Sequence, residues 1–434
     1  MGRAVTWLRG IPQKFWFIPV VCIVIAIAFA QALVSIDQAG LGLPEPIRGF
    51  LVEVGVDGAR ALLSSVATFL GVAGTAFSIT ISVVSTASTT YGPRLVRNFM
   101  RDRNNQMVLG VLVATFVYTL LVLRTIQSAT DDGEAFVPHL AVNFAILLGT
   151  VDVLLFVWFI HHIAESVQVE TLSANARGDF ERAVSDNWLD ASERRVDLID
   201  PPEEGGATIT LGRSGYLVQV DRQALVDDLT EGRARLRLLK RCGDQVMADE
   251  PVAIVWPPER AEAMQDEVRD HLHVAPSRTT VQDVRFAQQQ VVELAVRAMS
   301  PGTNDPYTAI NAIEQVTYGV LSAASRPTSG NTLLDDDLAQ RLYVRPVTVS
   351  ELVDTPFDHI RPYAKQTRIV LTALVDLAAR IREVAHDPEI AARADRHVDA
   401  LLAVADLDDR DREALVEHVA LSRRRSVTAP PAQP

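Results

Sequence analysis

Residues 61–93 read ALLSSVATFLGVAGTAFSITISVVSTASTTYGP, a stretch of 33 residues without a charged side chain. A helix needs about 20 mainly apolar residues to cross a bilayer, so this segment predicts a membrane span. Three similar stretches lie nearby: residues 15–36 and 104–123 carry no formal charge, and residues 135–164 carry one, at Asp152. The sequence therefore predicts four transmembrane helices, at about residues 15–36, 61–89, 106–126 and 138–163.

The first apolar stretch resembles a secretory signal peptide in its position, but its apolar run is too long for one. Residues 30–39 also show no convincing small-x-small cleavage site. We therefore expect residues 15–36 to be retained as a membrane helix.

Basic residues in the short connecting segments predict the orientation of the helices, because cytoplasmic loops carry an excess of Lys and Arg. The first 14 residues hold three basic and no acidic residues, and residues 91–105 hold four basic and one acidic. Residues 37–60 and 124–134 are instead richer in acidic residues. We expect a multi-pass protein of the plasma (inner) membrane with both termini in the cytoplasm.

The charge distribution divides the chain in two. Residues 1–164 hold 10 basic and 9 acidic residues, whereas residues 165–434 hold 31 and 45. This segregation excludes a single soluble globular domain, and the acidic second part excludes a nucleic-acid binder that works by bulk charge. The two cysteines, Cys22 and Cys242, are too far apart in sequence for a disulfide framework or a cysteine-rich metal site.

Residues spaced alternately four and three apart in the second span form a stripe of small side chains. A spacing that averages 3.5 places them on one face of a slightly supercoiled helix. The opposite face carries Leu63, Leu70, Phe77, Ile81 and Val84. All eight stripe residues are small and seven have a hydroxyl group: Ser64, Thr68, Gly71, Thr75, Ser78, Ser82, Ser85 and Thr89.

This stripe has two interpretations. Small residues let helices pack closely, and hydroxyl groups can hydrogen-bond across helices or back to their own chain. Alternatively, the hydroxyl groups line a pore or substrate path and partly replace the hydration of an ion. Packing alone could use Ala, so both interpretations stay open, and they are compatible if the helix packs against its symmetry mates around an axis.

Asp152 lies about midway along the fourth span, between Pro138 and Glu165. A carboxylate at that depth is costly unless it is paired, protonated or hydrated. It is either a structural group that faces the bundle interior, toward the hydroxyl stripe, or an intramembrane ion or proton site. The nearby His161, His162 and Glu165 do not suggest a metal site, because adjacent histidines point about 100° apart on a helix.

The region after the fourth span is expected to be cytoplasmic and α+β. Residues 165–200 predict a polar helix, to about residue 195, and a linker. Residues 201–260 predict a small β-barrel-like module with turns at 213–215 and 242–244. Within it, RCGDQVMADEPVAIV (241–255) is similar to the second half of biotinyl/lipoyl-type barrels. No Met-Lys-Met-type modification site is present, so no cofactor is expected.

Residues 261–425 predict a helical domain. Ser300–Gly302 ends one helix, and Asp305 with Pro306 begins the next as N-cap and first residue, which favours a capped helix–turn–helix over an anion site. Helices continue to residue 425, with breaks expected at Pro356, Pro362, Pro388 and 406–411. Residues 426–434 are expected to be a disordered tail.

A search for catalytic motifs finds no Walker loop, GxGxxG, GxSxG, HExxH or CxxC pattern. His271 and His273 lack a third metal ligand nearby in sequence, and the acidic run 335–337 is typical of a solvated surface. We therefore predict no catalytic, cofactor-binding or metal-binding residue.

Several phrases together resemble a bacterial family of predicted membrane proteins, domain of unknown function 2254. They are TASTTYGPRLVRNFMRDRNNQMVLG (86–110), FVYTLLVLRTI (116–126), VWFIHHIAESVQ (157–168), SGYLVQVD (214–221) and VQDVRFAQQQVVELAVRAMSPGTNDPYTA (281–309). The similarity covers roughly residues 10 to 425. It implies a four-span N-terminal region and a cytoplasmic C-terminal region, and it implies no activity or site residues.

Two functions are compatible with these patterns. The first is an oligomeric ion channel or transporter with a cytoplasmic regulatory domain, whose acidic charge would attract cations. The second is a membrane-anchored signalling or scaffold protein whose cytoplasmic domain binds a protein partner. An enzyme has the least support. A homo-oligomer embedded in the lipid bilayer is expected, and neither the permeant ion nor the stimulus is specified by the sequence.

Overall fold

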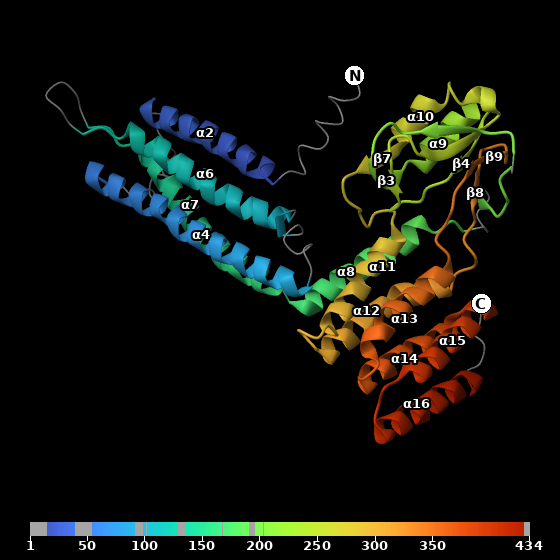
Figure 1. Cartoon of the computed structure of the whole chain (residues 1–434). Helices are drawn as coiled ribbons and strands as arrows, with labels where there is room; N and C mark the ends of the chain where they lie inside the picture. The colour runs from blue at the N-terminus through green and yellow to red at the C-terminus, as the bar shows by residue number, and fades with distance from the viewer. Residues whose placement is uncertain are drawn as a thin grey trace. The chain divides into compact units, whose positions relative to one another are not determined.

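The computed structural model describes residues 15–39, 54–91, 99–100, 102–128, 135–166, 168–190, 196–202 and 204–428. The side chains of residues 89–91 and 425–428 lie outside this description. The chain forms two compact units, residues 1–168 and 169–434 (Figure 1).

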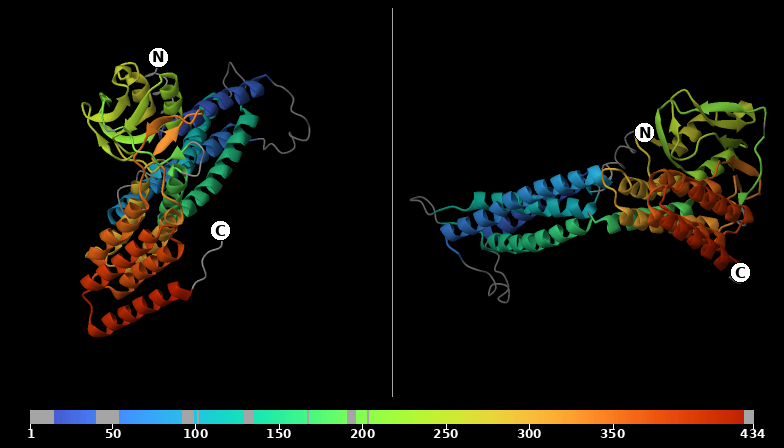
Figure 2. Two further views of the ribbon diagram at one scale, coloured as in Figure 1. Left: turned by 90° about the vertical axis from the view of Figure 1, so that its right-hand side faces the viewer. Right: turned by 60° about the horizontal axis from the view of Figure 1, so that its bottom comes forward.

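The first unit is a bundle of four helices that lie side by side (Figure 2). They are α2 (Phe17–Gln38), α4 (Val56–Tyr91), α6 (Arg103–Thr125) and α7 (His139–Ser166). All four are long and apolar enough to cross a membrane. The predicted fold class, four membrane helices followed by an α+β region, is therefore confirmed.

Polar contacts at the two ends of the bundle show that α7 runs antiparallel to α2 and to α6. At one end, Asp37 of α2 accepts hydrogen bonds from the backbone N–H groups of Leu140 and Ala141, at 3.2 and 3.1 Å. A carboxylate at a helix N-terminus is favourable, so this contact also stabilises the start of α7. At the other end, His162 near the end of α7 lies 2.9 Å from Asp102, the N-cap of α6.

Small residues allow the helices of the bundle to approach closely. A Cβ atom at Gly110 of α6 would lie 3.0 Å from Cys22 Sγ and 3.2 Å from Pro19 Cα of α2, so this crossing depends on glycine. Large apolar side chains such as Leu154 and Val157 face outward, as expected for a surface in contact with lipid.

The second unit contains a helical layer and two sheets. The helices are α8 (Val169–Asn187), α11 (Val284–Ala298), α12 (Pro306–Ala324), α13 (Val349–Ala364), α14 (Arg368–Val384), α15 (Pro388–Val404) and α16 (Asp409–Thr428). α8 is shorter than the polar helix expected from residue 165 to about 195. The predicted cap of α12 is present, because Asp305 Oδ1 accepts a hydrogen bond from the Thr308 N–H at 3.1 Å and Pro306 occupies the first position.

The breaks expected at Pro356 and Pro362 are wrong, since both prolines lie inside α13. Pro356 cannot donate a hydrogen bond to the carbonyl of Leu352 four residues earlier. Gln288 Nε2 of α11 donates to that carbonyl at 2.5 Å, so a neighbouring helix satisfies the group that proline leaves free. The other two breaks agree with the structure, because Pro388 begins α15 and residues 405–408 separate it from α16.

The six-stranded sheet has the order β1-β8-β9-β4-β6-β2, and the three-stranded sheet has the order β5-β3-β7. The strands are β1 (Val196–Asp197), β2 (Ala207–Thr210), β3 (Gly215–Val220), β4 (Arg235–Leu238), β5 (Gln245–Val246), β6 (Pro251–Trp256), β7 (Leu272–Ala275), β8 (Thr332–Leu334) and β9 (Gln340–Tyr343). Two short helices, α9 (Arg222–Glu231) and α10 (Gln265–His271), pack with them, and a 3-10 turn spans Pro258–Arg260.

This architecture corrects the expectation of a barrel-like module within residues 201–260. The strands form sheets rather than a closed barrel, and β7, β8 and β9 come from the region expected to be purely helical. The parallel pair β4–β9 joins Leu236 to Leu342, both fully buried. Their apolar side chains complete the core between segments that are distant in sequence. Residues 426–428 extend α16 in place of the expected disordered tail, and the rest of that tail lies outside the described residues.

Candidate functional site

The stripe of small residues lies on the exposed face of α4. Its residues Ser64, Thr68, Gly71, Thr75, Ser78, Ser82 and Ser85 are all exposed, and the side chain of Thr89 lies outside the described residues. The opposite face contains the buried residues Ala59, Leu63, Ala73, Phe77 and Val84. Ile81, expected on the buried side, is 42% exposed. Within the part of the chain that the structure describes, the stripe is therefore uncovered, and packing among the described helices of one bundle does not account for it.

The hydroxyl groups of the stripe differ in how they are satisfied. Thr68 Oγ1 donates to the Ser64 carbonyl at 2.8 Å, and Thr75 Oγ1 donates to the Gly71 carbonyl at 3.0 Å. The hydroxyl groups of Ser78, Ser82 and Ser85 form no hydrogen bond within the described part of the chain. Hydroxyl groups without partners are costly in hydrocarbon, so this face is better suited to another helix or to water than to lipid.

Asp152 lies inside the bundle and is only 2% exposed. Thr115 Oγ1 of α6 donates a hydrogen bond to its Oδ1 at 3.2 Å. The expectation that Asp152 points toward the stripe is wrong, because its partner lies on α6 while the stripe is on the outer face of α4. The structure therefore separates the two sites that the sequence suggests within the membrane.

A cavity of about 230 Å³ lies beside this hydrogen bond, between α2, α6 and α7. Thr115 belongs to its wall, whereas most of the other lining side chains are apolar, among them Ile25, Phe29 and Leu148. A water molecule or small apolar molecule in this cavity would reach the hydroxyl group that holds Asp152.

The histidines singled out from the sequence each pair with a different carboxylate. His161 lies 3.3 Å from Glu165, one helical turn away, and His162 pairs with Asp102 as described above. In the second unit His271 lies 2.7 Å from Asp228, and His273 lies 2.9 Å from Asp221. The hydrogen bond from His273 is the main cause that lowers the pKa of Asp221. Among the described residues, no group of three His, Cys, Asp or Glu side chains is arranged to hold a metal ion.

Comparison with known proteins places the chain in a family. The profile of the family described as "Predicted membrane protein (DUF2254)" matches residues 12–380. The chain is 30% identical over 365 residues to an uncharacterized protein of Mycobacterium tuberculosis and to one of Mycobacterium bovis. Each alignment covers 80% of this chain and 66% of the mycobacterial protein, so the chain spans only about two thirds of the length of these relatives. No solved structure matches the chain. The chain belongs to the family of predicted membrane proteins DUF2254.

Proposed function

We propose that the protein is a homo-oligomeric channel or transporter of the plasma (inner) membrane, with residues 169–434 as its cytoplasmic regulatory unit. The observation that supports this proposal is the exposed stripe on α4. A single copy presents these hydroxyl groups on one outer face. A ring of copies with this face inward would enclose a path lined by hydroxyl groups, which partly replace the hydration of a passing ion.

The hydroxyl groups of Ser78, Ser82 and Ser85, which have no hydrogen-bond partner among the described residues, favour this arrangement over contact with lipid. In hydrocarbon each could bond only to a carbonyl of its own helix, as Thr68 and Thr75 do, whereas in an aqueous path water is also available as a partner. Thr68 and Thr75 bond to their own helix and therefore need no partner from water or from another copy.

The basic flanks of the spans support a cytoplasmic location for both termini. In this orientation the second part of the chain, with its excess of acidic residues, is on the cytoplasmic side of the membrane. A negative body there raises the local concentration of cations, so we propose a small cation as the permeant species.

A second candidate function is a membrane-anchored signalling or scaffold protein. The observation that favours it is the size of the second unit, which has its own core of buried residues around Leu225, Leu236 and Val255. In this case the stripe serves only as an interface between copies, and the second unit binds a protein partner.

The test is conduction by the purified full-length protein in planar bilayers. Ser82→Leu places a bulky apolar side chain on the stripe, and we expect it to reduce the conductance at least about tenfold. Val83→Leu is the matched control, because Val83 is also exposed but lies outside the stripe. Wild-type conductance from Ser82→Leu would contradict the channel, and a complete lack of conductance in the wild type would favour the scaffold.

A further inference from the structure

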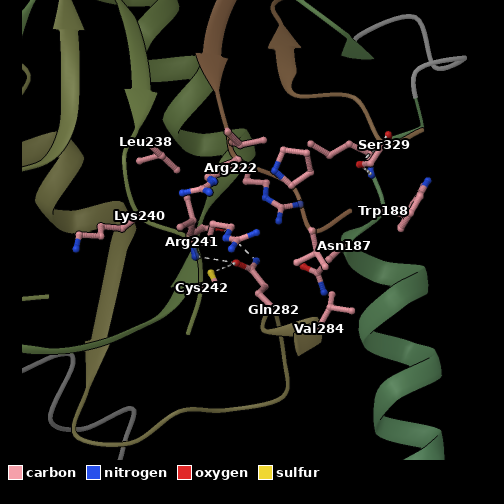
Figure 3. A pocket seen from close by; sticks show the side chains of 16 residues that line it. Asn187, Trp188, Arg222, Leu238, Lys240, Arg241, Cys242, Gln282, Val284 and Ser329 are labelled. Carbon is pink, nitrogen blue, oxygen red and sulfur yellow. Dashed lines mark hydrogen bonds between the residues drawn. The ribbon is translucent and has the colours of Figure 1, made fainter. Parts of the chain in front are cut away.

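A cavity of about 60 Å³ in the second unit collects basic side chains (Figure 3). Of its 16 lining residues four are basic, namely Arg222, Lys240, Arg241 and Arg345, and none is acidic. This composition is unexpected in residues 165–434, where acidic residues outnumber basic ones by 45 to 31. The cavity is therefore a local positive site within an acidic body.

Two of the four basic residues already have carboxylate partners. Lys240 pairs with Glu250, and Figure 3 shows its side chain pointing away from the other labelled residues. Arg241 Nη1 donates to both carboxylate oxygens of Glu351, at 3.1 and 3.0 Å. The Nε atom of Arg241 is nevertheless buried without a hydrogen-bond partner in the described structure.

Arg222 and Arg345 have no such partner among the described residues. Neither guanidinium forms a hydrogen bond or ion pair with any residue that the structure describes. Arg345 is exposed, but Arg222 at the start of α9 is partly buried, and this burial lowers its pKa. The neighbouring Cys242 does not neutralise it, because burial raises the pKa of that thiol to about 12. A partly buried cation without an anion is unfavourable, and a bound anion would offset its cost.

The wall beside Arg222 is held in place by specific hydrogen bonds. The side-chain amide of Gln282 accepts from the Val220 N–H at 2.8 Å and donates to the Val220 carbonyl at 3.1 Å. It also accepts from Cys242 Sγ at 3.3 Å. The adjacent Gly243 has φ +95°, and a Cβ atom there would lie 1.9 Å from Asp283 Oδ2. The hydrogen bonds of Gln282 therefore hold together the cavity wall formed by Val220 and Cys242, and the turn beside it requires glycine.

We propose that this cavity binds the phosphate group of a small ligand. The planar guanidinium group matches the oxygen geometry of phosphate and can form two parallel hydrogen bonds to it. A phosphate group carries about 1.5 to 2 negative charges at pH 7, which offsets most of the charge of these two guanidinium groups, whereas a carboxylate carries one. Arg222 binds the group inside the cavity, and Arg345 closes over it from the exposed side. The proposal does not depend on whether the protein conducts.

The test is isothermal titration calorimetry of the full-length protein with inorganic phosphate, at an ionic strength held constant with sodium chloride. We expect one saturable site whose affinity falls at least about tenfold in Arg222→Gln and Arg345→Gln. Arg235→Gln is the matched control and should bind as wild type. Arg235 lies on the exposed side of β4 outside the cavity, and its substitution removes the same charge.

A second probe, dioctanoyl phosphatidic acid below its micelle concentration, separates the two sources of a phosphate group. Binding of this lipid with the same dependence on Arg222, without binding of inorganic phosphate, would assign the group to a lipid headgroup. In the absence of phosphate, the Tm of Arg222→Gln should equal or exceed that of the wild type, because the variant removes a charge without a partner. A loss of affinity in this variant then reflects the loss of the guanidinium group and not a loss of folding. Equal affinities in wild type and Arg222→Gln, or no saturable heat with either probe, would overturn the proposal.

Discussion

Thr115 and Asp152 join α6 to α7 through a hydrogen bond of 3.2 Å within the bundle interior. Asp152 is 2% exposed, so this bond replaces water for at least one of its carboxylate oxygens. This hydrogen bond explains how an acidic residue is accommodated inside the bundle. Substitutions of Asp152 can therefore be chosen to keep or to remove the acceptor of the bond.

Substitution of Asp152 should therefore affect stability through this bond. Asp152→Asn retains an acceptor for Thr115 and should assemble with wild-type thermal stability. Asp152→Ala leaves the threonine hydroxyl without its partner and should cost about 1–3 kcal/mol, measured as a lower melting temperature in detergent.

The same asparagine variant tests an ionic role of Asp152. It keeps the size of the side chain and removes the titratable charge. If the role of Asp152 is structural, the flux through Asp152→Asn should equal that of the wild type from about pH 5 to 8. Loss of flux, or of its pH dependence, in a normally assembled Asp152→Asn protein would instead establish an ion or proton site.

The stripe predicts which positions of α4 meet between copies. In a background without Cys22 and Cys242, Ser78→Cys and Ser82→Cys should form disulfide-linked dimers under mild oxidation, detected by non-reducing electrophoresis. Phe77→Cys should not, because Phe77 is 7% exposed and stacks on Phe159 with ring centroids 4.4 Å apart. Equal cross-linking on both faces, or a strictly monomeric protein, would argue against assembly through the stripe.

The orientation of the bundle can be checked with reporter fusions. Tags at residues 1 and 434 should report the cytoplasm, and a tag near Asp131 should report the outside, because the basic flanks belong to the cytoplasmic side. A C-terminal tag on the outside would contradict both the orientation and the proposed regulatory unit.

Asp354 should make the second unit sensitive to acid. Burial opposes its ionisation, but hydrogen bonds from Arg393, both at 2.6 Å, and from His397, at 2.7 Å, outweigh this and lower its pKa. A lowered pKa in the folded state contributes stability above the ordinary aspartate pKa, and this contribution is lost as pH falls through the folded value.

The measurement is the melting temperature of wild type and Asp354→Asn as a function of pH. At pH 7 the variant should be less stable by about 3 kcal/mol, since Arg393 loses its carboxylate. The difference should begin to shrink below about pH 4, where the carboxylate of the unfolded wild type protonates, and should be lost as pH falls through the lower pKa of the folded state. A constant difference over the whole range would show that Asp354 contributes by shape alone.

The membrane helices and several caps could be predicted from sequence because their determinants are local. An uncharged stretch specifies a span wherever it occurs, and Asp305 with Pro306 specifies the start of α12 by itself. Pro356 could not be placed correctly, because the compensating donor, Gln288, lies 64 residues from Leu352 in the chain. Strands β8 and β9 are short, and only their pairing with distant strands makes them recognisable.

The candidate sites were accessible from sequence to different degrees. The period of the stripe located it on one face of α4, but only the three-dimensional bundle shows which face the rest of the chain covers. No local sequence pattern identifies Arg222, because the residues next to an arginine in the chain do not show whether its guanidinium group has a partner in the folded protein. The described lining of the cavity contains no acidic residue, and it comes from segments that are distant in the chain, among them residues 187–189, 238–242 and 344–347.

The pairing of β4 with β9 has a consequence for how the second unit can be dissected. β4 lies between β6 and β9, and β9 is contributed by residues that follow α11 and α12 in the chain. A fragment limited to residues 201–260 would leave β4 as an open edge strand beside an uncovered apolar layer, which favours aggregation. The sheet therefore cannot be separated from α11 and α12 by cutting the chain at residue 260, because β8 and β9 follow those helices in the sequence.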